Sequence, residues 1–193
     1  MKGSAKRRDR KWYDVVNKRT DIYQYSKGMY FHRNVKILGF LSNYKFRSIF
    51  EAAAGAPFLA EIINLFVHVD KYVLNDFSIP AIKFNRKFFK GRQNIFISSH
   101  DMEQPVKRVF ENIDVFICNS LEHIENDIKL LSSIQEGAII IICSPNFKSK
   151  SHVRYFESIE GMKERYKSLM SFEHEYIISN SHHEKYLLCG KKI

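Results

Sequence analysis

Short apolar runs alternate along this chain with segments whose apolar residues recur at helical spacing, and this alternation limits the available folds most strongly. The most apolar run is Ala138–Cys143 (AIIIIC). Unbroken apolar runs of this length suit strands that are buried on both faces of a parallel sheet. Strands that alternate with helices therefore predict an open α/β fold.

The same alternation predicts where the individual strands and helices lie in the sequence. Five successive strands are predicted at Ser48–Glu51, Tyr72–Asn75, Asn94–Ile97, Ile113–Cys118 and Ala138–Cys143. Helices are predicted between them at Pro57–Val67, Ile79–Phe89 and Ile124–Ile134. The last two strand-like runs, Phe172–Ile178 and Lys185–Leu188, have no room for a helix between them, so we expect an antiparallel pair that closes the sheet.

Length and composition describe an ordinary folded chain. With 193 residues, 45% hydrophobic and 27% charged, we expect a single domain over residues 12–193. Within it, residues 12–47 would form a helical lid and residues 48–193 a Rossmann-like core. The three cysteines are far apart and suggest neither a disulfide framework nor a zinc ribbon. Without a signal peptide or an apolar run long enough to span a membrane, we expect a cytoplasmic protein.

Half of the formal net charge of +10 lies at the start of the chain. The first eleven residues hold six Lys and Arg and one Asp, and the remainder carries +5. We expect residues 1–11 to form a mobile basic tail. Such a tail is compatible with nucleic acid, but no nucleic-acid motif accompanies it, so a solvated tail is favoured.

Polar residues follow successive predicted strands. Glu51 ends the first strand, ahead of the small-residue turn AAAGAP, and Asp76 follows the second strand, 21 residues after Gly55. Asp101 follows the third strand and Asn119 the fourth. The carboxyl ends of parallel strands are where open α/β sheets bind ligands, and an acid about 20 residues beyond a glycine turn suits ribose hydroxyls. Asp76, Asp101 and Asn119 each fit a helix cap better than a ligand contact when taken alone, but together they predict one cleft.

Over residues 35–190 the chain resembles class I S-adenosylmethionine-dependent methyltransferases. Glu51–Pro57 stands where that family has E/D-x-G-x-G-x-G, and YVLNDFSIPAIKFNRK and HDMEQPV resemble its second and third motifs. The most specific stretch is IDVFICNSLEHIENDIKLLSSIQEGAIIIICSPNF. The resemblance implies a three-layer Rossmann-like fold with a seven-stranded, mostly parallel sheet and S-adenosylmethionine as cofactor.

The resemblance also implies roles for individual residues. Glu51, Ala53 and Gly55 would lie along the methionine and ribose, and Asp76 would accept from the ribose hydroxyls. Asp101 would accept from the adenine amino group, Phe77 and Met102 would enclose the ring, and Asn119 would lie near the methyl group. Ala53 replaces the first motif glycine and Pro57 the third. A cofactor-free binding module therefore remains an alternative.

Candidate residues for the acceptor lie after the fourth and fifth strands and in the N-terminal helices. His123 is the candidate catalytic base, because an imidazole with an ordinary pKa of ~6.5 removes protons near neutrality. Alternatively, His123 opens the next helix and only positions Asn119 or the substrate. We expect His152, Arg154, Tyr25 and Tyr30 to contact substrate; Arg154 alternatively pairs with a carboxylate such as Glu157, and the tyrosines alternatively pack in the core.

The predicted function is methyl transfer to an O or N atom of a small-molecule or sugar-like acceptor. RNA methylation that uses the basic tail is the alternative from another substrate class. Glu122 and His123 with His152 resemble part of the metal site of small-RNA 3′-end 2′-O-methyltransferases, which has two Glu and two His. Asn119 stands in place of the first Glu, and asparagine is a poor substitute, so we expect no metal. The sequence does not indicate an oligomeric state.

Overall fold

A computed structural model describes residues 10–19, 22–104, 107–179 and 183–193, and the side chains of residues 16–19, 22–29 and 107 lie outside this description. Two helices come first, α1 (Arg10–Arg19) and α2 (Ile22–Leu41). Seven strands follow: β1 (Ser48–Ala52), β2 (Lys71–Asn75), β3 (Ile95–Ser98), β4 (Val115–Cys118), β5 (Ile139–Pro145), β6 (Met170–Ser179) and β7 (Glu184–Lys192). Between them lie α3 (Phe58–Phe66), α4 (Ile79–Phe88), η1 (Lys107–Val109), η2 (Leu121–His123), α5 (Asp127–Ser132) and α6 (Ile159–Tyr166).

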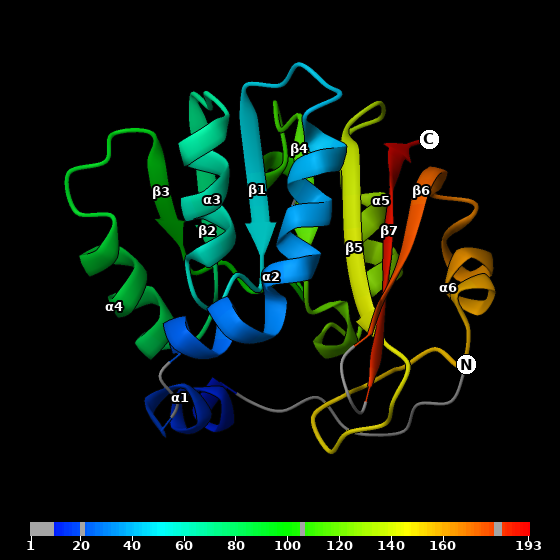
Figure 1. The fold of residues 1–193 in the computed structure, drawn as a ribbon, viewed down its shortest axis with the longest axis horizontal. Helices are drawn as coiled ribbons and strands as arrows, with labels where there is room; N and C mark the ends of the chain where they lie inside the picture. Colours follow the sequence, from blue (N-terminus) through cyan, green and yellow to red (C-terminus); the bar gives the residue numbers. More distant parts are fainter. Residues whose placement is uncertain (1–9, 20–21, 105–106, 180–182) are drawn as a thin grey trace.

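The described strands form one sheet in the order β3-β2-β1-β4-β5-β7-β6. The first five strands are parallel, and β7 runs antiparallel to both β5 and β6. The predicted fold class is therefore confirmed: a mostly parallel seven-stranded sheet with a reversed C-terminal pair. In Figure 1 the arrows of β1, β3 and β5 point toward the side where α1 lies. We call this side of the sheet the carboxyl edge.

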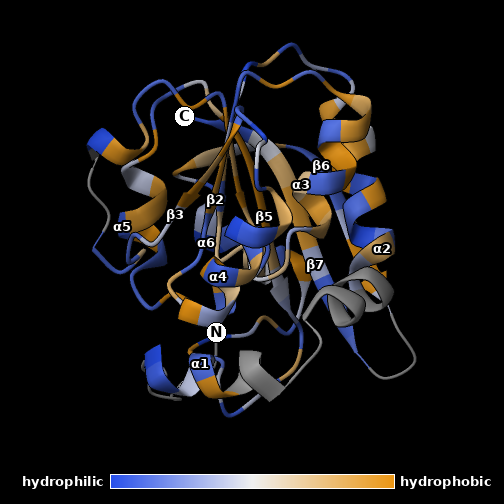
Figure 2. Cartoon of the chain, turned by 90° about the vertical axis from the view of Figure 1, so that its left-hand side faces the viewer, coloured by the Kyte–Doolittle hydropathy of each residue, from blue (hydrophilic) through white to orange (hydrophobic). Residues whose placement is uncertain are grey.

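Two apolar cores, one on each face of the sheet, produce three layers. Ile49 of β1 packs with residues of α2 and α3, including Phe40 and Ile63. Its neighbour Phe50 points to the other face and packs with residues of α5 and α6, including Leu131 and Met162. The alternation follows from strand geometry, because successive side chains point to opposite faces. Figure 2 shows the apolar strands enclosed between the helices.

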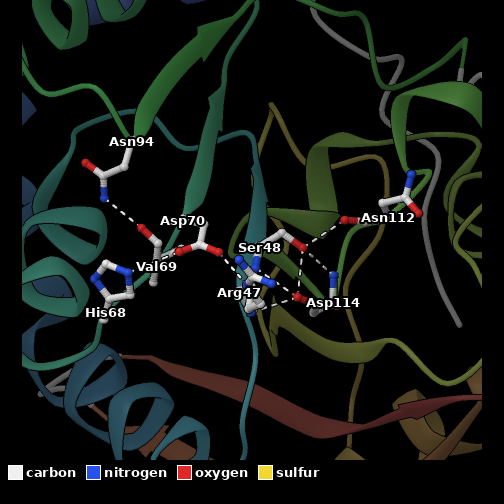
Figure 3. A network of polar contacts seen from close by, with 8 residues as sticks. All are labelled: Arg47, Ser48, His68, Val69, Asp70, Asn94, Asn112 and Asp114. Carbon is white, nitrogen blue, oxygen red and sulfur yellow. Dashed lines mark hydrogen bonds and ion pairs between the residues drawn. The ribbon is translucent and has the colours of Figure 1, made fainter.

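A polar network holds the strands at the end opposite the carboxyl edge. Asp114 accepts hydrogen bonds through Oδ2 from the main-chain N–H groups of Arg47 (2.7 Å) and Ser48 (2.9 Å) and from the Ser48 hydroxyl (2.9 Å). Figure 3 shows this network beside Asp70, which pairs with Arg47. These bonds hold the starts of β1 and β4 together, and therefore fix how their carboxyl ends align.

None of the described helices is long and apolar enough to cross a membrane. Residues 1–9 of the predicted tail lie outside the description, and α1 begins at Arg10. The division into tail, lid and core stays a prediction.

Candidate functional site at the carboxyl edge

Glu51 and Asn119, which end neighbouring strands, meet at the carboxyl edge. Asn119 Nδ2 lies 3.3 Å from Glu51 Oε1, and the Tyr72 hydroxyl donates to Glu51 Oε2 at 2.8 Å. Glu51 is only 2% exposed. Burial raises its pKa to about 7, although the hydrogen bond from Tyr72 and the nearby Arg33 charge act in the opposite direction. A buried carboxyl group with a raised pKa therefore lies next to the last residue of β1.

Asp76 fastens the small-residue turn to the end of β2. Its Oδ2 accepts from the Gly55 N–H at 2.8 Å, and its Oδ1 accepts from the Ser78 N–H at 2.8 Å. Asn85 of α4 also donates to the Gly55 carbonyl at 3.0 Å. Burial raises the pKa of Asp76, and the main-chain donors only partly offset this. The predicted pairing of an acid with the glycine turn is thus present in the folded chain.

The turn adopts a left-handed backbone at two positions. Gly55 has φ of +58°, which glycine adopts without strain. Ala53, where the family motif has glycine, has φ of +50°. An L-residue in this region costs ~1–2 kcal/mol, so the turn keeps the conformation of a glycine motif at a position that lacks glycine.

The third strand brings Asp101 and Met102 to the same edge. Asn75 and His100 bond to one another through the amide of Asn75 and the main chain of His100, at 3.0 and 2.9 Å. Asp101 Oδ1 accepts from the Glu103 N–H at 3.1 Å. Met102 is buried in the apolar core with Val73. The roles of Asp101 and Met102 toward adenine stay predictions.

Helix α1 covers the edge between the ends of β2 and β4. The Tyr13 ring lies 5.7 Å from the ring of Phe77 and 5.5 Å from the ring of His123. Asp14 Oδ1 accepts from the N–H of Ile79, at the start of α4, at 2.8 Å. Phe77, predicted to contact adenine, therefore lies beneath α1.

Glu122, His123, His152 and Lys185 form a compact charged cluster beyond β4 and β5. Lys185 Nζ lies 3.4 Å from Glu122 Oε1, and His123 Nε2 lies 4.0 Å from the same oxygen. The two histidine rings are 5.3 Å apart. Burial acts to raise the pKa of Glu122, but Lys185 and the two histidines outweigh it and the pKa falls below its usual range. Burial lowers the pKa of His152, which favours its neutral form.

Arg154 is buried and holds the turn before α5. Its Nη1 donates to the carbonyl oxygens of Leu121 (3.0 Å) and Ile124, and its Nη2 donates to that of Glu125 at 2.7 Å. Its carboxylate partner is Asp127, at 3.0 Å, rather than the predicted Glu157. These contacts give Arg154 a positioning role, and its contact with substrate stays a prediction.

Of the two tyrosines predicted to contact substrate, only Tyr30 has a described side chain. The guanidinium of Arg33 lies 4.1 Å from the Tyr30 ring centre, and Lys185 Nζ lies 5.2 Å from it. Tyr25 lies in α2, and its side chain is outside the described residues. Tyr30 thus joins α2 to the cluster around Glu122.

Sequence reasoning missed Arg33, Lys185 and Tyr72 as neighbours of the site. Tyr72 is fully buried and read only as part of an apolar strand, although a strand tyrosine needs a partner for its hydroxyl. Lys185 is the first residue of a predicted strand, and a lysine at such a position does not indicate a binding site. Arg33, 6% exposed, is a helix residue whose burial depends on how α2 packs.

The strand order, the reversed β7 and a carboxyl edge lined by Glu51, Asp76 and Asn119 define one class of architecture: the fold of class I S-adenosylmethionine-dependent methyltransferases. The resemblance seen in the sequence is confirmed at this level.

Particular solved structures share this fold at low sequence identity. The N-methyltransferase NodS from Bradyrhizobium japonicum, bound to S-adenosyl-L-homocysteine, is 13% identical with a TM-score of 0.75; the match covers 96% of this chain and 99% of NodS. Magnesium protoporphyrin IX methyltransferase from Synechocystis, with bound S-adenosylmethionine, is 14% identical with a TM-score of 0.64, over 84% of this chain and 79% of that one. A chain of the complex between the Haloferax volcanii Trm112 methyltransferase activator and a methyltransferase is 9% identical with a TM-score of 0.68, and the match covers 94% of this chain and 94% of that one. No protein-family model matches the sequence, and no curated protein matches it.

Proposed function

We propose that this chain is an S-adenosylmethionine-dependent methyltransferase. The observation that carries the proposal is the contact between Asp76 and the Gly55 turn, beside Glu51, at the carboxyl edge of a methyltransferase fold. Structures of this fold from Bradyrhizobium and Synechocystis hold the cofactor or its demethylated product. Ligands of open α/β sheets bind at this edge.

The residues present fit the cofactor. The Asp76 carboxylate accepts hydrogen bonds from the main-chain N–H groups of Gly55, Ser78 and Phe77, and its two oxygens offer about four lone-pair sites, so one site remains for a ribose hydroxyl. An ionised Glu51 attracts the cationic methionine part. The bound cofactor would supply an electrophilic methyl group on a sulfonium, and the protein would align the acceptor with it, which is mainly a matter of proximity.

The cofactor proposal is tested by titrating S-adenosylmethionine calorimetrically into wild type and Asp76→Ala. Loss of the charged acceptor should remove ~1.5–3 kcal/mol of binding free energy, which lowers the affinity by about one to two orders of magnitude. Asp70→Ala is the matched control, because Asp70 precedes the same strand at its opposite end. Equal affinities for wild type and Asp76→Ala would contradict the assignment. No binding by wild type would favour the cofactor-free module.

For the acceptor, we propose an O or N atom of a small-molecule or sugar-like compound, with His123 as the base. Support comes from the resemblance of the LEH and PN segments and from the position of His123 beyond β4. His123 Nδ1 lies 3.0 Å from the Ser151 carbonyl oxygen, so the neutral ring carries its proton on Nδ1 and Nε2 is the basic atom.

The base is tested once an accepted substrate is found. With a hydroxyl acceptor, His123→Ala should lower turnover by ~10²–10⁴ with nearly unchanged cofactor affinity. His68→Ala, at a 92% exposed side chain, is the control. An unaltered rate and acceptor affinity would remove His123 from the chemistry.

A second candidate acceptor, RNA, is favoured by one specific observation. Lys83, Arg86, Lys87 and Lys90 recur at helical spacing along α4 and its end, and all are exposed. We call these four residues the α4 stripe. Like charges at this spacing weaken a helix and attract polyanions, which is the reason to test this candidate.

A further inference from the structure

Two cationic side chains from different elements lie on either side of one aromatic ring near the carboxyl edge. Arg33 belongs to α2, and Lys185 belongs to β7, where it pairs with Pro145 at the end of β5. The Arg33 guanidinium lies 4.1 Å from the ring centre of Tyr30, and Lys185 Nζ lies 5.2 Å from it. Burial and the Arg33 charge act to lower the pKa of Lys185, but Glu122 outweighs them and keeps it raised. Both side chains are therefore cations, and they repel one another.

Arg33 is a buried charge whose close partners are neutral. The residue is 6% exposed, and its Nε and Nη2 both donate to Oδ1 of Asn34, at 3.1 and 3.0 Å. The thiol of Cys143 is a further neighbour, and burial raises its pKa, so it stays neutral. Glu51 interacts with the Arg33 charge, but no described carboxylate forms an ion pair with Arg33. Because buried charges are normally paired, this guanidinium points to an anionic ligand.

Lys185 is only partly neutralised by Glu122. Its Nζ lies 3.4 Å from Glu122 Oε1, which exceeds the ~2.7–2.9 Å of a close charge-assisted hydrogen bond. The pKa of Glu122 lies below its usual range, whereas burial raises that of Glu51 to about 7. Below neutrality Arg33 and Lys185 thus face one ionised carboxylate. A single negative charge balances the cluster, which suits a carboxylate better than a phosphate monoester with a charge of about −2.

An unpartnered oxygen at the end of β4 indicates that the ligand also carries a donor. Asn119 is 4% exposed, and its Oδ1 accepts no hydrogen bond from any described residue. Its Nδ2 lies 3.3 Å from Glu51, which interacts with the Arg33 charge. Buried amide oxygens normally accept a hydrogen bond, and a hydroxyl or an amine of the ligand would supply it.

We propose that Arg33 and Lys185 bind a carboxylate group of the methyl acceptor, which is therefore a hydroxy acid or an amino acid. The proposal rests on the methyltransferase function proposed above. Glu122 Oε1, 3.4 Å from Lys185, also lies 4.0 Å from His123 Nε2. A carboxylate bound to Lys185 thus brings the rest of the compound close to the proposed base. The side chains of Lys185 and His123 are 17% and 24% exposed, so this part of the cluster is open to solvent.

The test uses three probes that share a phenyl ring and differ in the polar group: benzoate, benzamide and phenyl phosphate. Each is titrated into the full-length protein, with and without S-adenosyl-L-homocysteine, and its dissociation constant is measured by saturation-transfer NMR. We expect benzoate to bind about tenfold to a hundredfold more tightly than benzamide, as charge-assisted hydrogen bonds predict. Tighter binding of phenyl phosphate than of benzoate would overturn the choice of a carboxylate.

Variants of the two cations connect the binding to this place. Arg33→Gln and Lys185→Met should each weaken benzoate binding by about tenfold or more and leave benzamide binding unchanged. Arg33→Lys, which keeps the charge, should retain part of the affinity. Arg92→Gln and Lys71→Met are the matched controls, because both residues are exposed and lie at the opposite end of the sheet, before β3 and at the start of β2.

Melting curves show which variants fold. Glutamine at position 33 keeps a donor for Asn34, and Lys185→Met combined with Glu122→Gln replaces Lys185→Met if that variant does not fold, since neither charge of the pair is then left alone. Equal affinity of wild type for benzoate and benzamide would overturn the proposal. Benzoate binding that survives the loss of both cations would also overturn it.

Titration of S-adenosylmethionine separates this proposal from the cofactor proposal. The affinity of Arg33→Gln for the cofactor should equal that of wild type. Weaker cofactor binding with unaltered benzoate binding would assign Arg33 to the methionine carboxylate and overturn the proposal. Benzoate binding that depends on both cations, in a protein that binds no S-adenosylmethionine, would confirm the carboxylate site but overturn its assignment to a methyl acceptor.

Discussion

Glu51 is a carboxyl group that the fold keeps from water beside Tyr72 and Asn119. Burial raises its pKa to about 7 in the folded chain, from the ordinary value of 4.5. Between these two values the unfolded chain is ionised while the folded chain still holds the proton. The contribution of Glu51 to stability is therefore present at low pH and is lost as the pH rises through about 7.

Replacing Glu51 by Gln tests this pH dependence. The neutral amide has nearly the same shape but does not titrate, so Glu51→Gln should gain on the order of 2 kcal/mol relative to wild type between pH 5 and pH 8. Urea unfolding at both pH values measures the difference. Glu136→Gln, at an exposed position, should follow wild type. Parallel curves for Glu51→Gln and wild type would mean that Glu51 is ionised throughout.

Ala53 combines a strained backbone with an extra methyl group in the turn proposed to face the cofactor. Ala53→Gly should relieve the positive φ and raise stability by ~0.5–1 kcal/mol. It should also tighten S-adenosylmethionine binding. Ala56→Gly, in the same turn but without a positive φ, should destabilise the chain. Chemical unfolding and calorimetry measure both, and equal effects of the two variants would contradict this account of Ala53.

At the scale of elements, a buried ionic network joins α5 to α6. Asp127 is 1% exposed and accepts from Arg165 through both oxygens at 2.7 Å and from the Tyr166 hydroxyl at 2.6 Å, besides its contact with Arg154. Burial acts to raise the pKa of Asp127, but the two arginines outweigh it and the pKa falls below its usual range. Its contribution to stability is present above the unfolded pKa and is lost as the pH falls through the folded value.

Asp127→Asn should destabilise the chain by ~3–5 kcal/mol at pH 7, because the buried guanidinium of Arg154 loses its counter-charge. The variant should also lose part of the acid-induced destabilisation of wild type. Asp70→Asn breaks a more exposed, solvent-screened ion pair and should destabilise the chain far less. Urea unfolding at pH 7 and at acidic pH measures the free energy of unfolding of both variants. A similar loss of stability in the two would show that the buried network stabilises the chain no more than an exposed ion pair does.

The presence of helices and strands was easier to predict than their limits, for reasons visible in two elements. The helix predicted at Ile124–Ile134 is α5, Asp127–Ser132, because Arg154 takes the carbonyl oxygens before it. The strand predicted at Lys185–Leu188 extends over Glu184–Lys192. Gly190 does not read as a strand residue, but a Cβ there would lie 1.7 Å from the Ser171 carbonyl oxygen, so tertiary pairing requires glycine.

At the scale of the whole molecule, the strand ends could be predicted and the lateral contacts could not. Glu51, Asp76 and Asn119 follow from strand spacing, because parallel strands end at one edge. Tyr13 and Arg33 reach the same edge from helices whose placement depends on tertiary packing. The contacts of His123 and His152 through Nδ1 could not be predicted either, because they depend on loop geometry.

The distribution of charge provides the last prediction, which separates the two acceptor classes. The α4 stripe begins near the carboxyl edge, since α4 starts at Ile79 beside Asp14 of α1. Figure 2 shows polar residues on the outward side of α4. If RNA is the acceptor, a labelled single-stranded oligonucleotide should bind with an affinity that falls steeply with salt concentration.

Reversing two charges of the stripe, Lys83→Glu with Lys87→Glu, should weaken oligonucleotide binding and reduce the slope of log affinity against log salt by about two. The control is Lys45→Glu with Lys71→Glu, which changes the net charge equally at the opposite end of the sheet. Fluorescence anisotropy at several salt concentrations measures both. If the two double variants lose affinity equally, only net charge matters and the α4 stripe is no binding site. If wild type does not bind at low salt, RNA is excluded as the acceptor and the small-molecule proposal stands alone, because a surface that methylates RNA must first hold its phosphates.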